Sequence, residues 1–220
     1  MRPGRESSWY APDVIDCIRG ARVSHDIGSH SGRHLYYDRI PEREADDDLA
    51  FARSIHEQHG LGFESFVFAR NRVARTGLLK GHGVRVFRGQ DRAWHQRIRN
   101  FHSGTGRIAN LADQALPIAP EPVRPVGEDG VVNLPGSMLF ASKNGLRRLA
   151  SPFVTASKLA RGVAAARRQH GVFHLWFHPS NFYHRPESQF AVFERFVARV
   201  AEEARRGMLG FQPMASFAAA

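Results

Sequence analysis

Two histidines spaced four residues apart, His30 and His34, are the residues whose type and spacing best suit chemistry in this sequence. On a tight loop or a first helical turn, two imidazoles at this spacing can converge on one ion, and neutral imidazole is a common ligand of zinc and similar divalent metals. A catalytic metal also needs a third protein ligand, usually a carboxylate or another histidine, and an open position. An H-x-x-x-H pair also arises by chance in a chain with 12 histidines. Spacing alone leaves both interpretations open.

The residues around the pair, Asp26-Ile-Gly-Ser-His-Ser-Gly-Arg-His34, extend the pattern. They resemble the second conserved motif of the polysaccharide deacetylases, a family of carbohydrate esterases, which is written E/D-I-G-x-H-S/T-x-x-H. Gly28 and Ser31 match this motif in addition to the histidines. Both histidines of the motif bind metal in that family. The resemblance therefore implies that His30 and His34 are ligands of a divalent ion, with zinc the first expectation.

Two later stretches resemble the same family in the same order. Phe66-Val-Phe-Ala-Arg-Asn71 is similar to its third motif in the variant F-V-F-P-R-N, with Ala69 where proline is usual. The arginine of that motif helps to orient a catalytic carboxylate, a role that would fall on Arg70. The alternative is a strand-end arginine that pairs with any neighbouring acid. Val86-Phe-Arg-Gly89 is similar to the strand that follows in the family, and Trp94 would line the sugar groove.

A fourth stretch, His174-Leu-Trp-Phe-His-Pro179, resembles the last motif of the family, whose final histidine acts as general acid. This role would fall on His178, because a histidine at a strand end can hand a proton to a departing amine. We expect Trp176 to contact substrate and His174 to be buried and hydrogen-bonded. Asp91, which follows another predicted strand, is a further candidate for the site.

The resemblance implies metal-assisted hydrolysis of N-acetyl groups on a polysaccharide or glycan. In the family, the ion polarises the acetyl carbonyl and holds a water, and a carboxylate takes the proton of that water. A histidine then protonates the sugar amine as acetate leaves. We expect His178 to perform this last step.

The family's first motif has no counterpart before residue 22. In the family it carries two acids on the first strand, one the general base and one the third metal ligand. We therefore expect that about two βα units, roughly 60 residues at ~30 per unit, are absent at the amino end. Asp13 and Asp16 lie on a predicted helix, the wrong context for these acids. Asp26 shares strand parity with His30 and could substitute only if its side chain reaches the same pocket.

Alternating strands and helices predict the fold class. Strands are expected at 23–29, 63–70, 84–88, 131–134, 172–178 and 208–217, and helices at 9–19, 41–59, 71–80, 91–101, 106–116, 155–170 and 187–206. This order is typical of an α/β protein with mostly parallel strands. The resemblance implies an incomplete or distorted (β/α) barrel. The candidate residues then fall at the carboxyl ends of strands, where such folds place their sites.

Length and composition favour one globular domain. The chain has 220 residues, of which 42% are hydrophobic, enough for a sizeable core. We expect residues 1–8 to be disordered and residues 9–220 to form the domain. The one cysteine excludes an intramolecular disulfide. The start lacks the apolar core of a signal peptide, and no run approaches the ~18 apolar residues of a membrane span, which predicts a cytoplasmic protein.

The charge of the chain leaves a further class of function open. A formal net charge of +10 allows a nucleic-acid or anionic-polymer partner. The arginines are spread over several predicted helices without a nucleic-acid motif, so solvated faces are the favoured interpretation and a nucleic-acid partner is not expected. The acidic run Asp46–Asp48 is interpreted as a solvated face too, since consecutive helical residues point in different directions.

Three hypotheses follow from the sequence. The favoured one is a polysaccharide deacetylase-family enzyme whose complete form carries the first motif. The second is a non-catalytic relative that binds glycan. The third is a basic nucleic-acid-binding α/β protein, which only the net charge supports.

Overall fold

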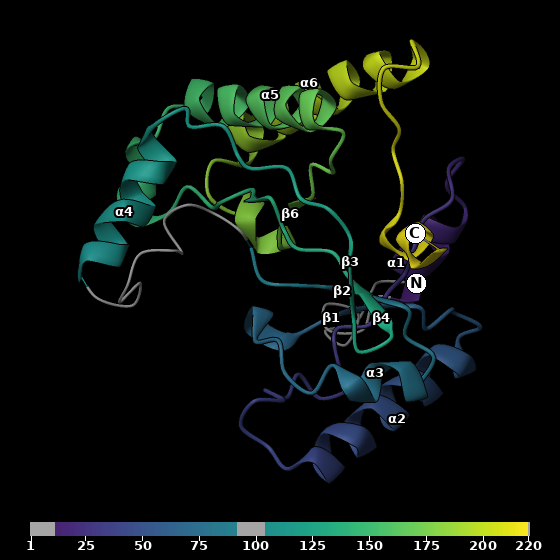
Figure 1. The fold of residues 1–220 in the computed structure, drawn as a ribbon. Coiled ribbons are helices and arrows are strands. Elements are labelled where there is room, and N and C mark those ends of the chain that lie inside the picture. The colour runs from purple at the N-terminus through teal and green to yellow at the C-terminus, as the bar shows by residue number, and fades with distance from the viewer. Residues whose placement is uncertain (1–11, 92–103, 220) are drawn as a thin grey trace, which may run out of the picture.

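The computed structural model describes residues 12–91 and 104–219, which form a mixed α/β structure (Figure 1). The helices are α1 (Pro12–Arg19), α2 (Glu42–Gln58), α3 (Gly77–Gly81), α4 (Gly104–Ala115), α5 (Pro152–Gln169) and α6 (Pro186–Arg205). Short 3-10 helices are η2 (Ala69–Asn71), η4 (Gly145–Leu149), η5 (Pro179–Phe182) and η6 (Met214–Ala219). The strands are β1 (Ser65–Val67), β2 (Val86–Arg88), β3 (Val126–Glu128), β4 (Val131–Asn133), β5 (Met138–Leu139) and β6 (Leu175–Trp176).

A four-stranded sheet in the order β1-β2-β4-β3 lies at the centre of the molecule (Figure 1). β1, β2 and β4 run parallel, and β3 pairs with β4 as an antiparallel hairpin. The hairpin turns at Asp129 and Gly130, whose φ values are 53° and 76°. Ser29 extends the sheet beyond β1 through a parallel bridge to Phe66. The parallel-rich sheet confirms the predicted α/β class.

A second parallel sheet follows directly and consists of β5 and β6. The chain leaves the first sheet at Leu134, whose carbonyl accepts a hydrogen bond from the Gly89 N–H at 3.2 Å. It joins the second at Ser137, whose N–H donates to the carbonyl of His174 at 2.9 Å. Ser29 pairs only with β1, and β6 pairs only with β5. The strands of residues 12–91 and 104–219 therefore do not close into a barrel.

Helices cover the strands on two sides, with α2 and α3 on one side and α5 and α6 on the other (Figure 1). The first core lies under α2. Ala45, Leu49 and Ala52 recur at helical spacing on its buried face and pack with Phe66 and Phe87 of the sheet. Each of these side chains is at most 3% exposed. Burial of this apolar stripe stabilises α2 more than its helix propensity does.

The second core lies between β5, β6, α5 and α6. Phe140 and Phe182 stack with their ring centroids 5.1 Å apart, and Leu159 of α5 packs with them. The start of α5 is fixed by Ser151, whose hydroxyl accepts a hydrogen bond from the Phe153 N–H at 3.2 Å. A third, smaller cluster joins the two halves of the chain, since Val86 of β2 packs there with Val123 and Leu134.

Several predicted strands are shorter than expected or absent. The segment 23–29 is paired only at Ser29, and Val23 is 65% exposed. The strand predicted at 208–217 is wrong, because this segment pairs with no strand and ends in η6. Pro213 lacks a backbone N–H, and Gly207 adopts a φ of 70°, which both disfavour a strand. β3 and β5 were not predicted.

The predicted helices agree better with the structure. The helices expected at 41–59 and 187–206 are confirmed, whereas the one expected at 71–80 is reduced to α3, since Asn71 and Arg75 adopt positive φ values of 56° and 57°. α5 ends at His170, which adopts the left-handed conformation. The helix expected at 91–101 and the disordered start at 1–8 lie largely or wholly outside the described residues.

The helices of the described ranges are too polar to span a membrane. The longest, α6, has 20 residues, and charged side chains recur along it from Glu187 to Arg205. Among residues 12–91 and 104–219, no helix is long and apolar enough to cross a membrane.

Candidate active site

The bridge at Ser29 leads directly into the loop that carries both candidate metal ligands. The Ser29 N–H donates to the carbonyl of Ser65, and the Ser29 carbonyl accepts from the N–H of Val67, so the backbone runs parallel to β1 up to this point. The rings of His30 and His34 follow with their centroids 5.0 Å apart and an interplanar angle of 75°. The structure thus brings the two histidines together at the carboxyl end of the sheet.

The histidine loop, residues 30–34, is not a helical turn. Ser31 and His34 adopt left-handed φ values of 66° and 58°, a conformation that is costly for residues with a Cβ. Gly32 approaches α2 so closely that a Cβ there would lie 2.6 Å from Cδ1 of Phe51. Contacts with α2 therefore determine the shape of this loop.

A buried carboxylate of α2, Asp48, holds the histidine loop in place. Its oxygens accept hydrogen bonds from the N–H groups of Gly32 (3.0 Å) and Arg33 (2.9 Å) and from the hydroxyl of Tyr37 (2.9 Å). Asp48 is 0% exposed. Hydrogen bonds to a charged acceptor contribute about 1.5–3 kcal/mol each, so this carboxylate is a strong anchor for the loop.

The interpretation of the run Asp46–Asp48 as a solvated face is wrong for Asp48. Asp46 does lie at the surface, where its carboxylate is 2.6 Å from Nε2 of His82. Asp48, however, follows Ala45 by three residues and precedes Ala52 by four, which places it on the buried face of α2. A charged residue in phase with buried apolar residues was the sequence signal for this anchor.

The hydrogen bond of His30 leaves one ring nitrogen free to bind a ligand. Nδ1 of His30 lies 2.8 Å from the carbonyl oxygen of Val67. A carbonyl can only accept, so Nδ1 carries the proton and Nε2 of the neutral ring presents a lone pair. Partial burial lowers the pKa of His30 despite this hydrogen bond, and the nearby charges of His34, Arg88 and His178 lower it further. A neutral ring is the form that binds metal.

His30 and His34 together fit two positions of a metal site. Their nitrogen donors suit zinc, and the fixed tautomer of His30 is the arrangement that metal-binding histidines usually show. Within residues 12–91 and 104–219, no group of three or more His, Cys, Asp or Glu side chains lies close enough together to hold an ion.

Arg88, Asp91 and Trp176 form a second group at the same end of the strands. The guanidinium carbon of Arg88 lies 4.1 Å from the ring centroid of Trp176, a cation–π contact. The indole N–H of Trp176 donates to both oxygens of Asp91, at 3.0 and 3.2 Å. Burial raises the pKa of the Asp91 carboxyl, while Arg88 and the indole lower it by less. Gly136 leaves room for this pair, since a Cβ there would lie 2.0 Å from Oδ1 of Asp91.

His178 stands next to this group, just after β6. Its ring centroid is 5.7 Å from that of Trp176, and its charge acts on His30. The backbone N–H of His178 donates to Oδ1 of Asn181 at 2.6 Å, which closes the first turn of η5. His174 lies deeper, and its Nδ1 donates to the carbonyl of Pro135 at 3.0 Å, as expected for a buried histidine. Burial lowers its pKa.

Three candidates remain, of which two lie in the described residues. Arg70 is exposed, with a left-handed φ of 52° and its guanidinium carbon 5.5 Å from the ring centroid of Tyr36. It forms no ion pair within the described ranges. The carboxylate of Asp26 accepts a hydrogen bond from the N–H of Ala215 at 2.8 Å, which engages it with η6. Trp94 lies outside the described residues.

Buried polar atoms without a hydrogen-bond partner in the described part of the chain gather at the carboxyl ends of the strands. They belong to Ser31, Asn71, Arg88, Asn133 and Ser142. Each residue either ends a parallel strand or follows one by at most four positions. Buried polar groups are normally paired, and an unpaired one costs about 1–3 kcal/mol. Their placement indicates that this end of the sheet is built to contact a ligand.

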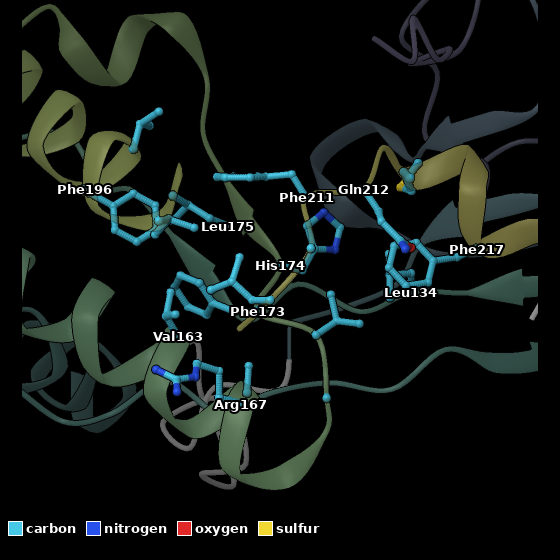
Figure 2. A pocket seen from close by; sticks show the side chains of 18 of the residues that line it. Leu134, Val163, Arg167, Phe173, His174, Leu175, Phe196, Phe211, Gln212 and Phe217 are labelled. Atoms are coloured by element: carbon cyan, nitrogen blue, oxygen red, sulfur yellow. The ribbon is translucent and has the colours of Figure 1, made fainter. Parts of the chain in front are cut away.

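An apolar pocket of about 600 Å³ lies along β6, between α5, α6 and the chain that follows α6. Figure 2 shows His174 between an apolar group around Phe196 and the C-terminal residues Gln212 and Phe217. The lining includes Phe173 and Leu175, residues of β6 and its approach. The pocket therefore brings residues of β6 and its approach together with α5, α6 and the segment after α6.

Known proteins do not place the chain in a family. No protein-family model matches its sequence, and no curated protein matches it significantly.

Proposed function

We propose that this chain carries the site of a metal-dependent deacetylase, which hydrolyses N-acetyl groups on a polysaccharide or glycan. The convergence of His30, His34 and His178 at the carboxyl ends of the strands supports this proposal most strongly. These residues come from two distant stretches that both resemble polysaccharide deacetylase motifs. Their meeting at one end of the sheet is what the shared resemblance requires.

His30 and His34 would hold the divalent ion, for which zinc is the first expectation. When bound, such an ion polarises the acetyl carbonyl and activates a water. Asp48 orients the ligands through the backbone of the histidine loop. His178, which follows β6, donates a proton from its imidazole to the amine of the leaving sugar.

The third ligand and the general base are proposed to be carboxylates delivered by a further strand. The succession of Ser29, β1, β2 and β4, followed by β5 and β6, supports an incomplete (β/α) barrel with free edges at Ser29 and β6. A strand between these edges would end between His30 and His178. The pocket along β6 offers apolar contacts for its side chains. Such a strand would come from residues other than those described.

Metal content and acetate release test the proposal together. We expect the purified protein to bind one zinc per active site and to release acetate from an N-acetylated oligosaccharide once the carboxylates are supplied. Sugar binding without acetate release would favour the non-catalytic glycan-binding relative. Binding to nucleic acid that persists at physiological salt would favour the third hypothesis instead, because non-specific phosphate contacts weaken steeply with salt.

Single histidine variants distinguish the proposed roles. His30→Ala and His34→Ala should each weaken zinc binding more than about 100-fold, since second-sphere changes alone cost 10–100-fold. His178→Ala should leave zinc binding unchanged and remove acetate release. His82→Ala is the matched control, because its ring contacts Asp46 at the surface. Zinc binding unchanged in both His30→Ala and His34→Ala would refute the ligand assignment.

A further inference from the structure

Arg88 is the most unusual charged residue of the described structure. It ends β2 and is only 7% exposed. Within residues 12–91 and 104–219 its guanidinium forms no ion pair and no hydrogen bond, and its Nε is completely buried. A guanidinium has five N–H donors and stays charged in proteins. Arg88 is therefore a buried cation whose donors have no partner in the described chain.

This arrangement is costly unless a ligand completes it. Removing a charged group from water without a partner costs several kcal/mol. The cation–π contact with Trp176, at 4.1 Å, offsets only part of this cost. That contact satisfies none of the N–H donors of Arg88, and its Nε has no hydrogen-bond partner in the described chain. Burial also lowers the pKa of Arg88, the sign of a cation in an unfavourable environment.

The groups around Arg88 favour an anion as the ligand. The charge of Arg88 acts on both His30 and His174. Asp91 is the one acid among the described residues whose charge acts on Arg88, and its oxygens already accept the indole N–H of Trp176. An ionised Asp91 already balances the charge of Arg88, so the unpaired N–H donors of Arg88, rather than an excess of positive charge, favour a ligand that accepts hydrogen bonds. A dianion would be repelled by Asp91 more strongly than a monoanion, which disfavours phosphate.

We propose that Arg88 binds a carboxylate at the carboxyl end of β2, with the indole of Trp176 as a rigid support for its guanidinium. The planar two-oxygen group of a carboxylate matches the N–H fork of arginine. This inference rests on the proposed function only for the source of the carboxylate, which is either an acidic sugar of the substrate or the acetate product. Binding itself requires neither metal nor turnover.

Carboxylate titration of the metal-free full-length protein tests this inference. Glucuronate, acetate, glucose and inorganic phosphate are each added at constant ionic strength in the presence of a chelator, and binding is followed by calorimetry and by the NMR signal of the Arg88 Nε–H. We expect a carboxylate Kd on the order of 1 mM. If glucuronate binds more tightly than acetate, the ligand is an acidic sugar. If acetate binds more tightly than glucuronate, the ligand is the acetate product. No carboxylate binding, or tighter phosphate binding, overturns the inference.

Variants establish whether Arg88 is the receptor. Arg88→Met should weaken carboxylate binding at least tenfold, and Arg88→Lys should weaken it less because it keeps the charge without the fork. Arg85→Met is the matched control, since Arg85 lies three residues earlier with a side chain that is 53% exposed and paired with Glu64. Unchanged binding in Arg88→Lys and Arg88→Met overturns the inference. Because no metal is present, this outcome would leave the deacetylase proposal untouched.

Discussion

The histidine loop and the segment that carries His178 reach the same site but are held in different ways. The loop is fixed by a fully buried carboxylate, Asp48, that bonds its backbone directly. His178 is exposed, and its backbone is held by two short-range bonds with Asn181: the His178 N–H donates to Oδ1 of Asn181, and the His178 carbonyl accepts from the Asn181 N–H. The proposed metal side is thus held by a buried carboxylate from a distant helix, whereas the proposed acid side is held by the local bonds of its own turn and by the packing of Phe177 next to it.

This difference matches the tasks proposed for the two regions. Metal ligands bind best when their geometry is fixed in advance, because the ion then causes no ordering cost. A general acid must approach the leaving group and exchange its proton with solvent. The contrast between the two regions is therefore open to direct test by variants that loosen each one.

The largest effect is expected from Asp48→Ala. This change removes a buried acceptor and leaves the N–H groups of Gly32 and Arg33 unpaired, so we expect the free energy of unfolding to fall by about 3–5 kcal/mol. Urea unfolding followed by circular dichroism measures it. Asp47→Ala, an exposed neighbour, should stay within about 0.5 kcal/mol of the parent. Equal effects of the two variants would show that the loop is not anchored as described.

A smaller effect is expected from Asn181→Ala. Loss of the bond from the His178 N–H should cost about 1 kcal/mol, the typical value for a helix-start cap. Faster amide exchange confined to residues 178–182 should accompany it, without any change in the histidine loop. Ser180→Ala, an exposed change in the same turn, is the control. A cost as large as that of Asp48→Ala would remove the contrast between the two regions.

The smallest effect concerns the pH dependence of stability through Asp91. Burial raises the pKa of this carboxyl in the folded protein, so the folded state binds the proton more tightly than the unfolded state does. Its contribution to stability is complete below about pH 4, where an unfolded aspartate titrates, and is lost as the pH rises through the raised pKa. Asp91→Asn should therefore lose less stability than the parent between pH 4 and pH 7.

Thermal unfolding at several pH values checks this prediction. The asparagine keeps an oxygen that can accept the indole N–H of Trp176, so the packing of the group is preserved. Glu121→Gln serves as the control for a carboxylate outside the group. A parallel pH profile for the parent and Asp91→Asn would show that Asp91 does not titrate with a raised pKa.

The sequence predicted the class of fold and the helices because these depend on local periodicity. The stripe of Ala45, Leu49 and Ala52 is sufficient to place α2. The strands were harder to predict, since β5 and β6 are two residues long and are defined by their partners rather than by their own pattern. Pro213 and Gly207 signalled against the strand predicted at 208–217, but the apolar residues between 208 and 217 outweighed them.

The sequence predicted where the three candidate histidines lie, but it did not predict the residues that hold them there. His30, His34 and His178 lie where the predicted strand ends placed them. Asp48 was missed because its acidic neighbours suggested a solvated helix start. The isolation of Arg88 could not be predicted from sequence, since it depends on which groups surround a side chain after folding.

The left-handed residues of the histidine loop also limit how this chain can vary. Ser31 and His34 are not fully buried, so a map of tolerated substitutions drawn from burial alone would allow almost any residue there. Their φ values of 66° and 58° instead exclude the β-branched residues and favour glycine or asparagine. In a library of random variants, positions 31 and 34 would therefore accept few residue types although they are not buried. The backbone conformation, rather than packing, would set this limit.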